Sequence, residues 1–189
     1  MKYKVASIQD LTEYQVQLIK NSYPNRYEKA LKYKFEDDFK RCILGYCLLI
    51  DLVGKLEEKN IFFNEFNKPF LCGGPDFSIS HSGDLVAVAI NNGLVGVDIQ
   101  KIDEKNLKLS KVFTNEEKEW INEKDSVNRF HVLWAQKESA MKLIGKGLTM
   151  KFDEIVIKNK GIISTPIGDI KNTTEILEEG YVFSLSYRE

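Results

Sequence analysis

The chain has 189 residues, of which 43% are hydrophobic and 29% are charged, and these proportions exclude an intrinsically disordered polypeptide. The formal net charge is −1, so no overall field attracts the protein to nucleic acid or to an anionic membrane, and any anion site has to be local. The N-terminal sequence lacks the apolar core of a signal peptide, and no segment has the roughly 18 apolar residues of a membrane span. Cys42, Cys47 and Cys72 fit neither a zinc spacing nor a disulfide framework, so we expect a reduced cytoplasmic protein.

Two helices are predicted in the first third of the chain. Residues 10–20 form a short helical pattern with Asp10 as its N-cap. The pattern is stronger over residues 36–54, where apolar residues recur at three- and four-residue spacing and Gly54 can end the helix.

A basic segment lies between these helices, after a turn at Pro24. Arg26 and Lys29 are spaced to share one helix face. Such runs are usually solvated surfaces, and the aromatic residues among them are too few to indicate nucleic-acid binding. Further along, Lys68 and Pro69 form an extended dipeptide.

The middle of the chain is strand-like. "FSISHSG" at residues 77–83 predicts a strand that ends in a Ser-Gly turn. Two apolar segments follow, at residues 85–90 and 94–100, on either side of Asn92 and Gly93. Because Asn-Gly favours the tight turns of β-hairpins, we expect these two strands to pair with each other.

The last third combines helices with strands. A charged helix is predicted over residues 115–124, and a longer amphipathic helix begins at Ser126, whose hydroxyl can cap it, and ends at the Gly-Lys-Gly sequence of residues 145–147. Three β-like segments, with a turn at residues 159–161, complete the chain: residues 152–158, 161–164 and 181–187.

This order of elements predicts an α+β fold, because strands and helices do not alternate regularly as in a doubly wound parallel sheet. "FSIS" at residues 77–80 is matched by "FSLS" at residues 183–186, each after a long helix. We therefore expect two related lobes, comprising residues 1–95 and 96–189.

The first candidate site lies on the strand at residues 94–100. Side chains alternate between the faces of a strand, so Asp98 and Gln100 point the same way and Gly96 leaves space beside them. Two oxygen-bearing groups on a rigid strand suit Mg²⁺, which takes one or two carboxylates and keeps several waters. The alternative is an ordinary polar face in contact with solvent.

The long helix supplies further candidates. Glu138 and Lys142 are four residues apart and share a helix face with Trp134. A carboxylate on a partly apolar face needs compensation, which either a Glu138–Lys142 salt bridge or a bound metal can supply. In the second case Lys142 is free to hold an anion, with Lys137 adding positive charge nearby. No phosphate-binding loop of the Walker type is present, so phosphate binding has to depend on side chains.

The two histidines differ in their surroundings. His81 lies at the end of a strand between serines, where it can donate to a phosphate, whereas His131 lies in an apolar helical segment and is interpreted as structural. The Ser80-His81 sequence does not indicate a hydrolase triad, because adjacent strand residues point apart and no nucleophile elbow is present.

In this order, the motifs resemble those of the Sfp-type 4′-phosphopantetheinyl transferases. The matching sequences are "NKP", "FSISHSGDLVAVAI", "VGVDI" and "FHVLWAQKESAMKLIGKGL", and the upstream "KRCILG" is similar to the family's arginine-bearing helix. The resemblance implies two similar α+β lobes with the site at their interface. It also implies transfer of the phosphopantetheine arm of coenzyme A to a serine of an apo acyl, peptidyl or polyketide carrier protein, with release of adenosine 3′,5′-bisphosphate.

The resemblance also implies roles for individual residues. Asp98 and Glu138 match the family's magnesium-binding carboxylates, and Glu138 is in addition the candidate base for the serine proton. Lys142 matches the lysine that holds the pyrophosphate. The remaining matches are candidate coenzyme A contacts: Ser80 and His81 at the phosphates, Arg26 and Lys29 near the 3′-phosphate, Lys68 beside the adenosine, and Lys137 as additional positive charge.

One position departs from the family pattern. Many members have a second acid two residues after the strand aspartate, where this chain has Gln100. A glutamine carbonyl can coordinate Mg²⁺ or orient a water but adds no charge, so we expect an active site with two carboxylates and an additional water.

Two other functions are compatible with the same residues. One is a noncatalytic module that binds coenzyme A or a nucleotide, and the other is a metal-dependent phosphoesterase that acts on water. The family resemblance favours the transferase, acting as a monomer, without nucleic acid or membrane as a partner. The sequence does not specify which carrier protein is modified.

Overall fold

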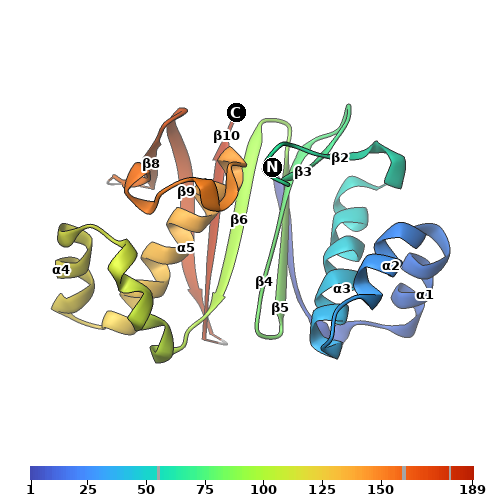
Figure 1. Ribbon diagram of the computed structural model, residues 1–189, viewed down its shortest axis with the longest axis horizontal. Coiled ribbons are helices and arrows are strands. Elements are labelled where there is room, and N and C mark those ends of the chain that lie inside the picture. Colours follow the sequence, from blue (N-terminus) through green and yellow to red (C-terminus); the bar gives the residue numbers. More distant parts are fainter. Residues whose placement is uncertain (55, 159–160, 179) are drawn as a thin grey trace.

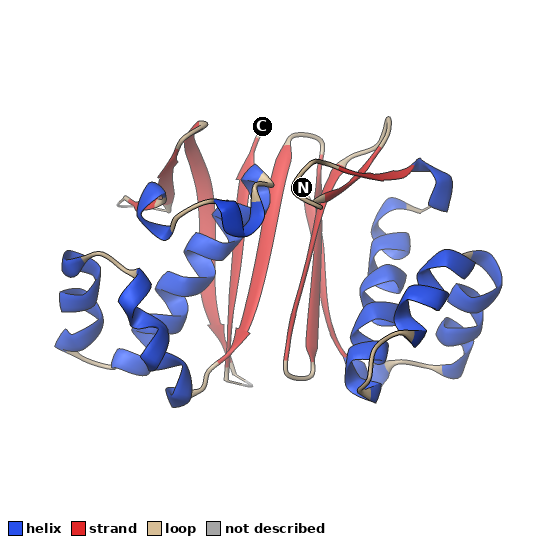
Figure 2. Ribbon diagram, in the orientation of Figure 1, coloured by secondary structure: helices blue, strands red, loops and turns tan. Residues whose placement is uncertain are grey.

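The protein is built from two antiparallel sheets in the middle of the molecule with helices on both sides (Figures 1 and 2). The computed structural model describes residues 1–54, 56–158, 161–178 and 180–189. The facing sides of the sheets enclose one apolar cluster, which includes Ala87, Val97 and Phe183. Separate clusters lie under the helices on the two outer sides. The predicted α+β class is therefore confirmed.

The N-terminal sheet has the strand order β1-β5-β4, and a separate β2–β3 ribbon accompanies it. Helix α3 packs on the outer side of this sheet and buries its central residues 42–49 there. The elements of this half are β1 (Lys2–Ser7), α1 (Glu13–Ser22), α2 (Pro24–Leu31), α3 (Glu36–Val53), β2 (Ile61–Phe63), β3 (Pro69–Leu71), β4 (Asp76–Ser82) and β5 (Leu85–Asn91).

The C-terminal sheet has the strand order β6-β10-β9-β8-β7, and helix α5 packs across β6 and β10. Among the described residues, no helix is long and apolar enough to cross a membrane. The elements of this half are β6 (Leu94–Lys101), the 3₁₀ helix η3 (Glu104–Val112), α4 (Asn115–Glu123), α5 (Ser126–Ile144), the 3₁₀ helices η4 (Gly147–Thr149) and η5 (Phe152–Glu154), β7 (Val156–Ile157), β8 (Ile162–Thr165), β9 (Gly168–Leu177) and β10 (Tyr181–Arg188).

The two sheets share a strand order. Strands β1, β5 and β4, with α3 between β1 and β4 in the chain, correspond to β6, β10 and β9 with α5. The match between "FSIS" and "FSLS" does not follow this correspondence. "FSIS" lies on β4, whereas "FSLS" lies on β10, which is the counterpart of β5. The expected lobe boundary between residues 95 and 96 stays a prediction, and it falls inside β6.

The predicted hairpin around Asn92 and Gly93 is wrong. Strand β5 is central in its sheet, with β1 on one edge and β4 on the other, so it has no free edge for β6. Instead β6 crosses to the second sheet and pairs with β10. Gly93 allows the chain to pass close to β10 at this crossing, because a Cβ at residue 93 would overlap the backbone of Arg188.

Several element boundaries also differ from the predictions. The first helix is capped by Thr12, which forms a capping box with Gln15, and Asp10 lies in the preceding 3₁₀ turn. Helix α5 has Asp125 at its N-cap position, and Ser126 is the first helical residue. Strands β1 and β9 were missed, and the turn at residues 159–161 includes two residues outside the described ones. Helix α3 and its end at Gly54 are confirmed.

Candidate active site

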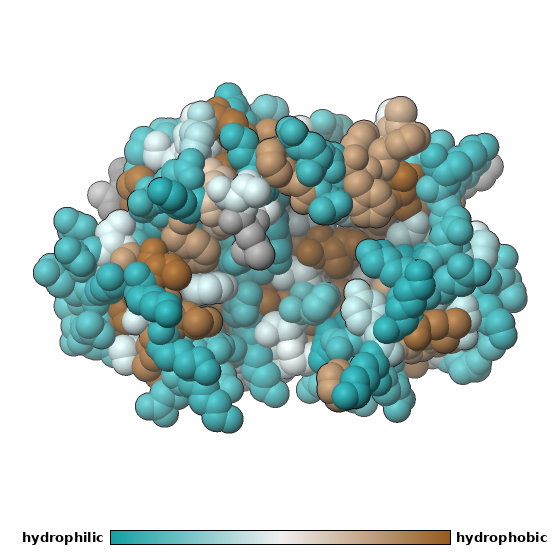
Figure 3. All heavy atoms as spheres, viewed as in Figure 1, coloured by the Kyte–Doolittle hydropathy of each residue, from teal (hydrophilic) through white to brown (hydrophobic). Residues whose placement is uncertain are grey.

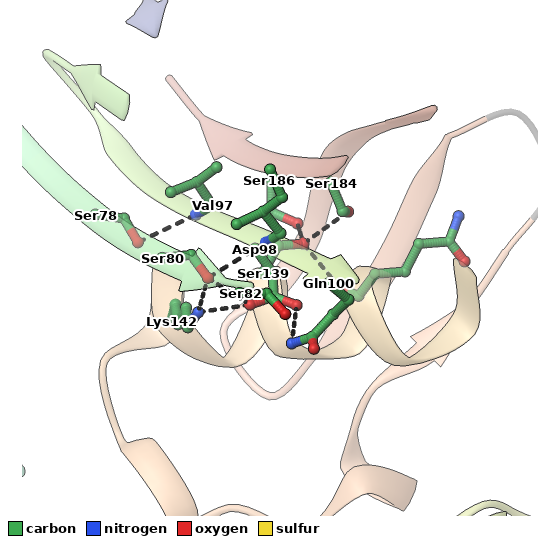
Figure 4. Close-up of polar contacts among 12 residues, drawn as sticks. Ser78, Ser80, Ser82, Val97, Asp98, Gln100, Ser139, Lys142, Ser184 and Ser186 are labelled. Carbon is green, nitrogen blue, oxygen red and sulfur yellow. Dashed lines mark hydrogen bonds and ion pairs between the residues drawn. The ribbon is translucent and has the colours of Figure 1, made fainter. Parts of the chain in front are cut away.

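Strand β6 divides its side chains between two environments. Val95, Val97 and Ile99 are buried between the two sheets. On the opposite face, Asp98 and Gln100 point toward α5 and line a cavity (Figure 4). The predicted alternation is therefore confirmed, and it places an acid in the space between β4, β6 and α5.

Gly96 allows α5 to lie directly on this face of β6. A Cβ at Gly96 would overlap the carbonyl oxygen of Ser139 and the backbone nitrogen of Leu143, both on α5. Because glycine has no such atom, the helix backbone comes close enough for Glu138 and Lys142 to reach the region of Asp98.

Asp98 is buried and its carboxylate is held by three protein groups (Figure 4). The Lys142 ammonium lies 2.6 Å from Oδ1, and the Ser80 hydroxyl donates to the same oxygen at 2.8 Å. The Gln100 amide nitrogen donates to Oδ2 at 2.9 Å. The lysine on α5 is therefore paired with the strand aspartate rather than with Glu138, one helical turn away.

Glu138 is partly buried, and no described residue forms a hydrogen bond with its carboxylate. Loss of water around the group raises the pKa of Glu138, the negative charge of Asp98 raises it further, and Lys142 opposes the shift. Glu138 is thus a carboxylate whose charge the protein compensates only in part, which is the condition expected of a proton acceptor or a cation ligand.

The cavity has a volume of about 430 Å³. Its polar part contains His81, Asp98, Glu138 and Lys142. The lining also contains apolar and aromatic side chains from η3, β4 and α5: Ile79, Leu109, Phe130 and Trp134. In the space-filling view, a recess lies near the middle of the face shown, with hydrophilic and hydrophobic side chains at its border (Figure 3). Such a cavity can hold a molecule that carries both an anionic and an apolar part.

His81 is exposed at the cavity, and two cations lie near it. Loss of water around the ring lowers the pKa of His81, and the positive charges of Arg41 and Lys142 lower it further. Arg41 on α3 is fixed by hydrogen bonds to the Gly83 carbonyl at 3.0 Å and to Asp38 at 3.1 Å. Arg41 therefore adds positive charge near His81, and the lowered pKa keeps the His81 ring neutral at physiological pH.

The second histidine is structural, although it borders the cavity. Nδ1 of His131 lies 2.8 Å from the Val127 carbonyl, and Nε2 faces the backbone N–H of Asp103 and the amide of Asn106. Burial lowers the pKa of His131. These partners match a neutral ring that donates from Nδ1 and accepts at Nε2.

The donor set is compatible with a hard divalent cation. The described residues contain no group of three His, Cys, Asp or Glu side chains arranged for a metal. Two carboxylates with the Gln100 amide nevertheless suit Mg²⁺, which binds one or two carboxylates together with waters and phosphates. The incomplete compensation of Glu138 next to Asp98 is the observation that favours a cation here.

Comparison with known proteins places this site in a family. Residues 94–185, which contain β6 and α5, match the model of the 4′-phosphopantetheinyl transferase superfamily. The chain is 30% identical over 155 residues to a 4′-phosphopantetheinyl transferase of Bacillus subtilis, covering 75% of this chain and 69% of the relative. The chain belongs to the 4′-phosphopantetheinyl transferase superfamily.

Two further relatives are also 4′-phosphopantetheinyl transferases. The 4′-phosphopantetheinyl transferase gsp of Aneurinibacillus migulanus is 36% identical over 140 residues, which is 69% of this chain and 59% of the relative. The transferase Sfp of Bacillus subtilis strain 168 is 32% identical over 146 residues, which is 71% of this chain and 65% of the relative. The chain therefore spans less than two thirds of the length of these two relatives.

In this superfamily member, six of the residues predicted from sequence meet around one cavity. They are Ser80, His81, Asp98, Gln100, Glu138 and Lys142. They come from β4, β6 and α5, which are separated by up to 62 residues in the chain.

Lys137 does not belong to this group, which corrects its expected part in anion binding. Its side chain is fully buried on the other side of α5. The ammonium lies 2.6 Å from the Glu117 carboxylate and donates to the carbonyls of Phe152 and Ile155, each at 2.8 Å. Burial lowers the pKa of Lys137, and Glu117 opposes that shift. The cation is used to hold α4 and η5 against α5.

Lys68 also lies outside the lining of the cavity. Its ammonium contacts the Asp76 carboxylate at 2.8 Å and the carbonyls of Leu143 and Val95 at 3.2 and 3.4 Å. With three acceptors inside the protein, it ties the segment before β3 to β4, β6 and α5. The structure gives no support to its expected place beside the adenosine.

Arg26 and Lys29 lie on α2, away from the lining of the cavity. The Arg26 guanidinium stacks on the ring of Tyr46, and Lys29 lies over the ring of Phe63. Their role at the 3′-phosphate stays a prediction.

Arg41 is a cation near the cavity that was not included among the predicted site residues. The sequence signal was the "KRCILG" segment, in which a basic residue precedes the buried face of a helix. Its proximity to His81 depends on the packing of α3 against the β4–β5 turn, which the sequence does not reveal.

Proposed function

We propose that this protein transfers the 4′-phosphopantetheine arm of coenzyme A to a serine of an apo carrier protein. The observation that supports this proposal best is the contact of Lys142 with Asp98 beside the undercompensated carboxylate of Glu138, in a cavity flanked by His81 and Arg41. Together with membership of the family, this arrangement offers cations for phosphates and a base for a hydroxyl.

Each residue has a distinct part in the proposed reaction. The serine oxygen forms a bond to the phosphorus that carries the pantetheine, and the bond from that phosphorus to the oxygen of adenosine 3′,5′-bisphosphate breaks. Glu138, whose carboxylate has no hydrogen-bond partner among the described residues, accepts the serine proton. Lys142, whose side chain is 30% exposed, faces the pyrophosphate and stabilises the charge of the leaving group.

The phosphates at the other end of coenzyme A also need positive charge. Arg41 is the nearest cation from the N-terminal half, and the neutral ring of His81 can donate a hydrogen bond to a phosphate. Arg41 keeps its charge at all physiological pH values and donates through a rigid fork, so it suits a phosphate better than a lysine would.

Asp98 and Glu138, with Gln100, would hold Mg²⁺ in this proposal. Bound there, the ion would supply positive charge to the pyrophosphate as its bond to the transferred group breaks.

A monomer as the active unit is part of the proposal. A cytoplasmic location also stays part of the proposal, because coenzyme A and apo carrier proteins have to be available to it together. Size-exclusion chromatography with light scattering, compared with activity across protein concentrations, tests the monomer.

The central experiment incubates the protein with coenzyme A, Mg²⁺ and a panel of apo carrier proteins, and measures intact carrier mass. We expect one phosphopantetheine per carrier with the wild type. In Glu138→Gln we expect a decrease in rate on the order of 10²–10⁴-fold. Glu175→Gln, at an exposed position on β9, is the matched control and should retain full activity.

Other outcomes would identify a different function. Cleavage of coenzyme A without any carrier would indicate a phosphoesterase. Binding of coenzyme A without cleavage or transfer, unaffected by Glu138→Gln, would indicate a noncatalytic module.

A further inference from the structure

The two sheets meet where β4 lies beside β6. Side-chain hydrogen bonds join these two strands, in place of the backbone–backbone hydrogen bonds of a continuous sheet. Strand β4 does not exchange backbone hydrogen bonds with β6, since the two belong to different sheets. Instead, four side-chain oxygens of β4 accept the N–H groups on one edge of β6. The bonds are Asp76 to Val95 at 2.8 Å, Ser78 to Val97 at 3.1 Å, Ser80 to Ile99 at 3.2 Å and Ser82 to Lys101 at 2.9 Å.

These four side-chain bonds form a seam between β4 and β6. The seam explains why polar and apolar residues alternate along β4. Phe77 and Ile79 point into the cluster under α3, and the residues between them point at β6. A hydroxyl on each alternate residue satisfies one N–H of an edge that would otherwise be buried without a partner. Ser78 has this task alone, because its hydroxyl accepts from Val97 and forms no other side-chain hydrogen bond with the described residues.

Ser80 differs from the other residues of the seam. Its hydroxyl accepts from Ile99 and from the Lys142 ammonium at 2.7 Å, and it donates to Asp98 at 2.8 Å. A serine hydroxyl has one donor and two acceptor positions, so all three are used inside the protein. Ser80 has no capacity left for a substrate phosphate while these bonds are present.

We propose that Ser80 is a positioning residue for Asp98 and Lys142 rather than a phosphate ligand. Ser80, Asp98 and Lys142 form a closed triangle, with distances of 2.6, 2.7 and 2.8 Å (Figure 4). An ammonium has three donors, and the triangle uses two of them. The third is left for the cavity, so the triangle orients Lys142 toward an anion bound there.

The seam also connects this orientation to the N-terminal half. Ser80 is anchored to Ile99 on β6 and is followed directly by His81 at the cavity. One residue therefore sets the positions of the Lys142 ammonium and of the His81 ring relative to Asp98. This role deepens the proposed function and depends on it for its effect on activity.

The first test compares Ser80→Ala with Ser78→Ala, because both remove one acceptor for a β6 N–H at buried positions of the same strand. We expect a decrease in melting temperature in both variants, and a larger one in Ser80→Ala, which also removes the bonds to Asp98 and Lys142. We expect kcat to decrease on the order of tenfold to a hundredfold in Ser80→Ala alone, with the KM for coenzyme A changed less than about threefold. An increase in KM with unchanged kcat would identify a phosphate ligand and overturn the proposal, as would equal activity of both variants.

The second test does not use activity. Urea unfolding of a double-mutant cycle measures the coupling between Ser80→Ala and Lys142→Ala, and the control cycle combines Ser78→Ala with Lys142→Ala. Coupling in the first cycle and additivity in the second are expected. Additivity in both would overturn the proposal. Coupling in a protein that modifies no carrier would instead retain the positioning role and reject the proposed function.

If an alanine variant does not fold, Ser80→Cys and Ser78→Cys replace the pair. A thiol has nearly the volume of the hydroxyl but is a weak donor and acceptor. The same differences in kcat and in coupling are expected, and their absence would overturn the proposal.

Discussion

Asp98 and Glu138 are neighbouring acids with opposite surroundings. Asp98 takes bonds from a lysine, a serine and a glutamine, whereas no described residue donates to the carboxylate of Glu138. Environment, rather than residue type, therefore assigns one acid to a fixed position and leaves the other available for a proton or a cation. This division is the basis for the predictions at single residues.

Gln100→Glu tests the role of the amide next to Asp98. The Nε2 group now donates to Asp98 at 2.9 Å, and a glutamate would replace that donor with a like charge. We expect a lower melting temperature in EDTA and a larger rise on addition of Mg²⁺ than in the wild type, because added charge strengthens cation binding. Gln9→Glu, at an exposed position outside the lining of the cavity, controls for net charge. An equal rise in both would place Gln100 outside the metal site.

Because His131 is buried, we expect the folded protein to lose stability in acid. Burial lowers its pKa in the folded state, so below about pH 6.5 the unfolded chain binds more protons at this residue than the folded one. Stability is therefore retained above that pH and lost as the pH falls through it. Urea unfolding between pH 7.5 and 5.5 should show a smaller pH dependence in His131→Asn than in wild type. Parallel curves would contradict this assignment.

At the level of elements, the contact between β6 and α5 is set by the absence of a side chain at Gly96. Gly96→Ala would overlap the backbone of α5 at Ser139 and Leu143, and backbone cannot move aside as a flexible side chain does. We expect a destabilisation of about 3 kcal/mol or more, with loss of activity because Glu138 is displaced from Asp98.

Gly45→Ala is the matched control in the other half. Gly45 lies in α3, and a Cβ there would meet only the side chains of Ile79 and Val86, at 3.2 and 3.5 Å. The gain in helix propensity of about 1 kcal/mol offsets this close contact, so stability near that of wild type is expected. Equal effects at the two glycines would show that the β6–α5 contact is not specially close.

The attachment of α4 depends on a buried cation. Glu117→Gln keeps a residue type that also completes capping boxes, yet it removes the charge that compensates Lys137. We expect a loss of about 3 kcal/mol, against about 1 kcal/mol for Thr114→Ala, which removes only the cap. Lys137→Met should cost less than Glu117→Gln, because the remaining glutamate is partly exposed and can be hydrated. Chemical unfolding measures all three, and the reverse order would contradict the argument.

At the level of the whole molecule, the two halves are joined by side chains rather than by a continuous sheet. The seam of β4 lies along the middle of this contact, and Lys68 closes one end by linking Asp76 to carbonyls of β6 and α5. The cavity lies toward the other end, at His81. These polar bonds therefore stabilise the contact between the halves, together with the apolar cluster between the two sheets.

Lys68→Met tests that statement. Removing a partly buried ammonium with three acceptors should cost about 2–3 kcal/mol in urea unfolding, with little change in the KM for coenzyme A. Lys4→Met, which breaks the exposed Lys4–Asp51 pair, should change stability by about 0.5 kcal/mol or less. A large increase in KM without loss of stability would return Lys68 to the adenosine site.

The sequence by itself determined the α+β class, helix α3, the alternation of β6, and the chemical identity of the main site residues. These features depend on local spacing, and residues two or four positions apart share a face in any fold that keeps the element. The family motif identified Asp98, Glu138 and Lys142 for the same reason. Asp98 lies within one strand, and Glu138 and Lys142 lie four residues apart within one helix.

Only the tertiary structure decided how those elements meet. Strands β5 and β6 lie in different sheets because β5 has no free edge. Lys137 is buried because Glu117 and two backbone carbonyls bind its ammonium there. The hydroxyl of Ser80 forms all of its hydrogen bonds within the protein. Each outcome depends on partners far away in the chain. A single sequence specifies which groups can form such bonds, whereas the choice among them is made by the packing of the two halves.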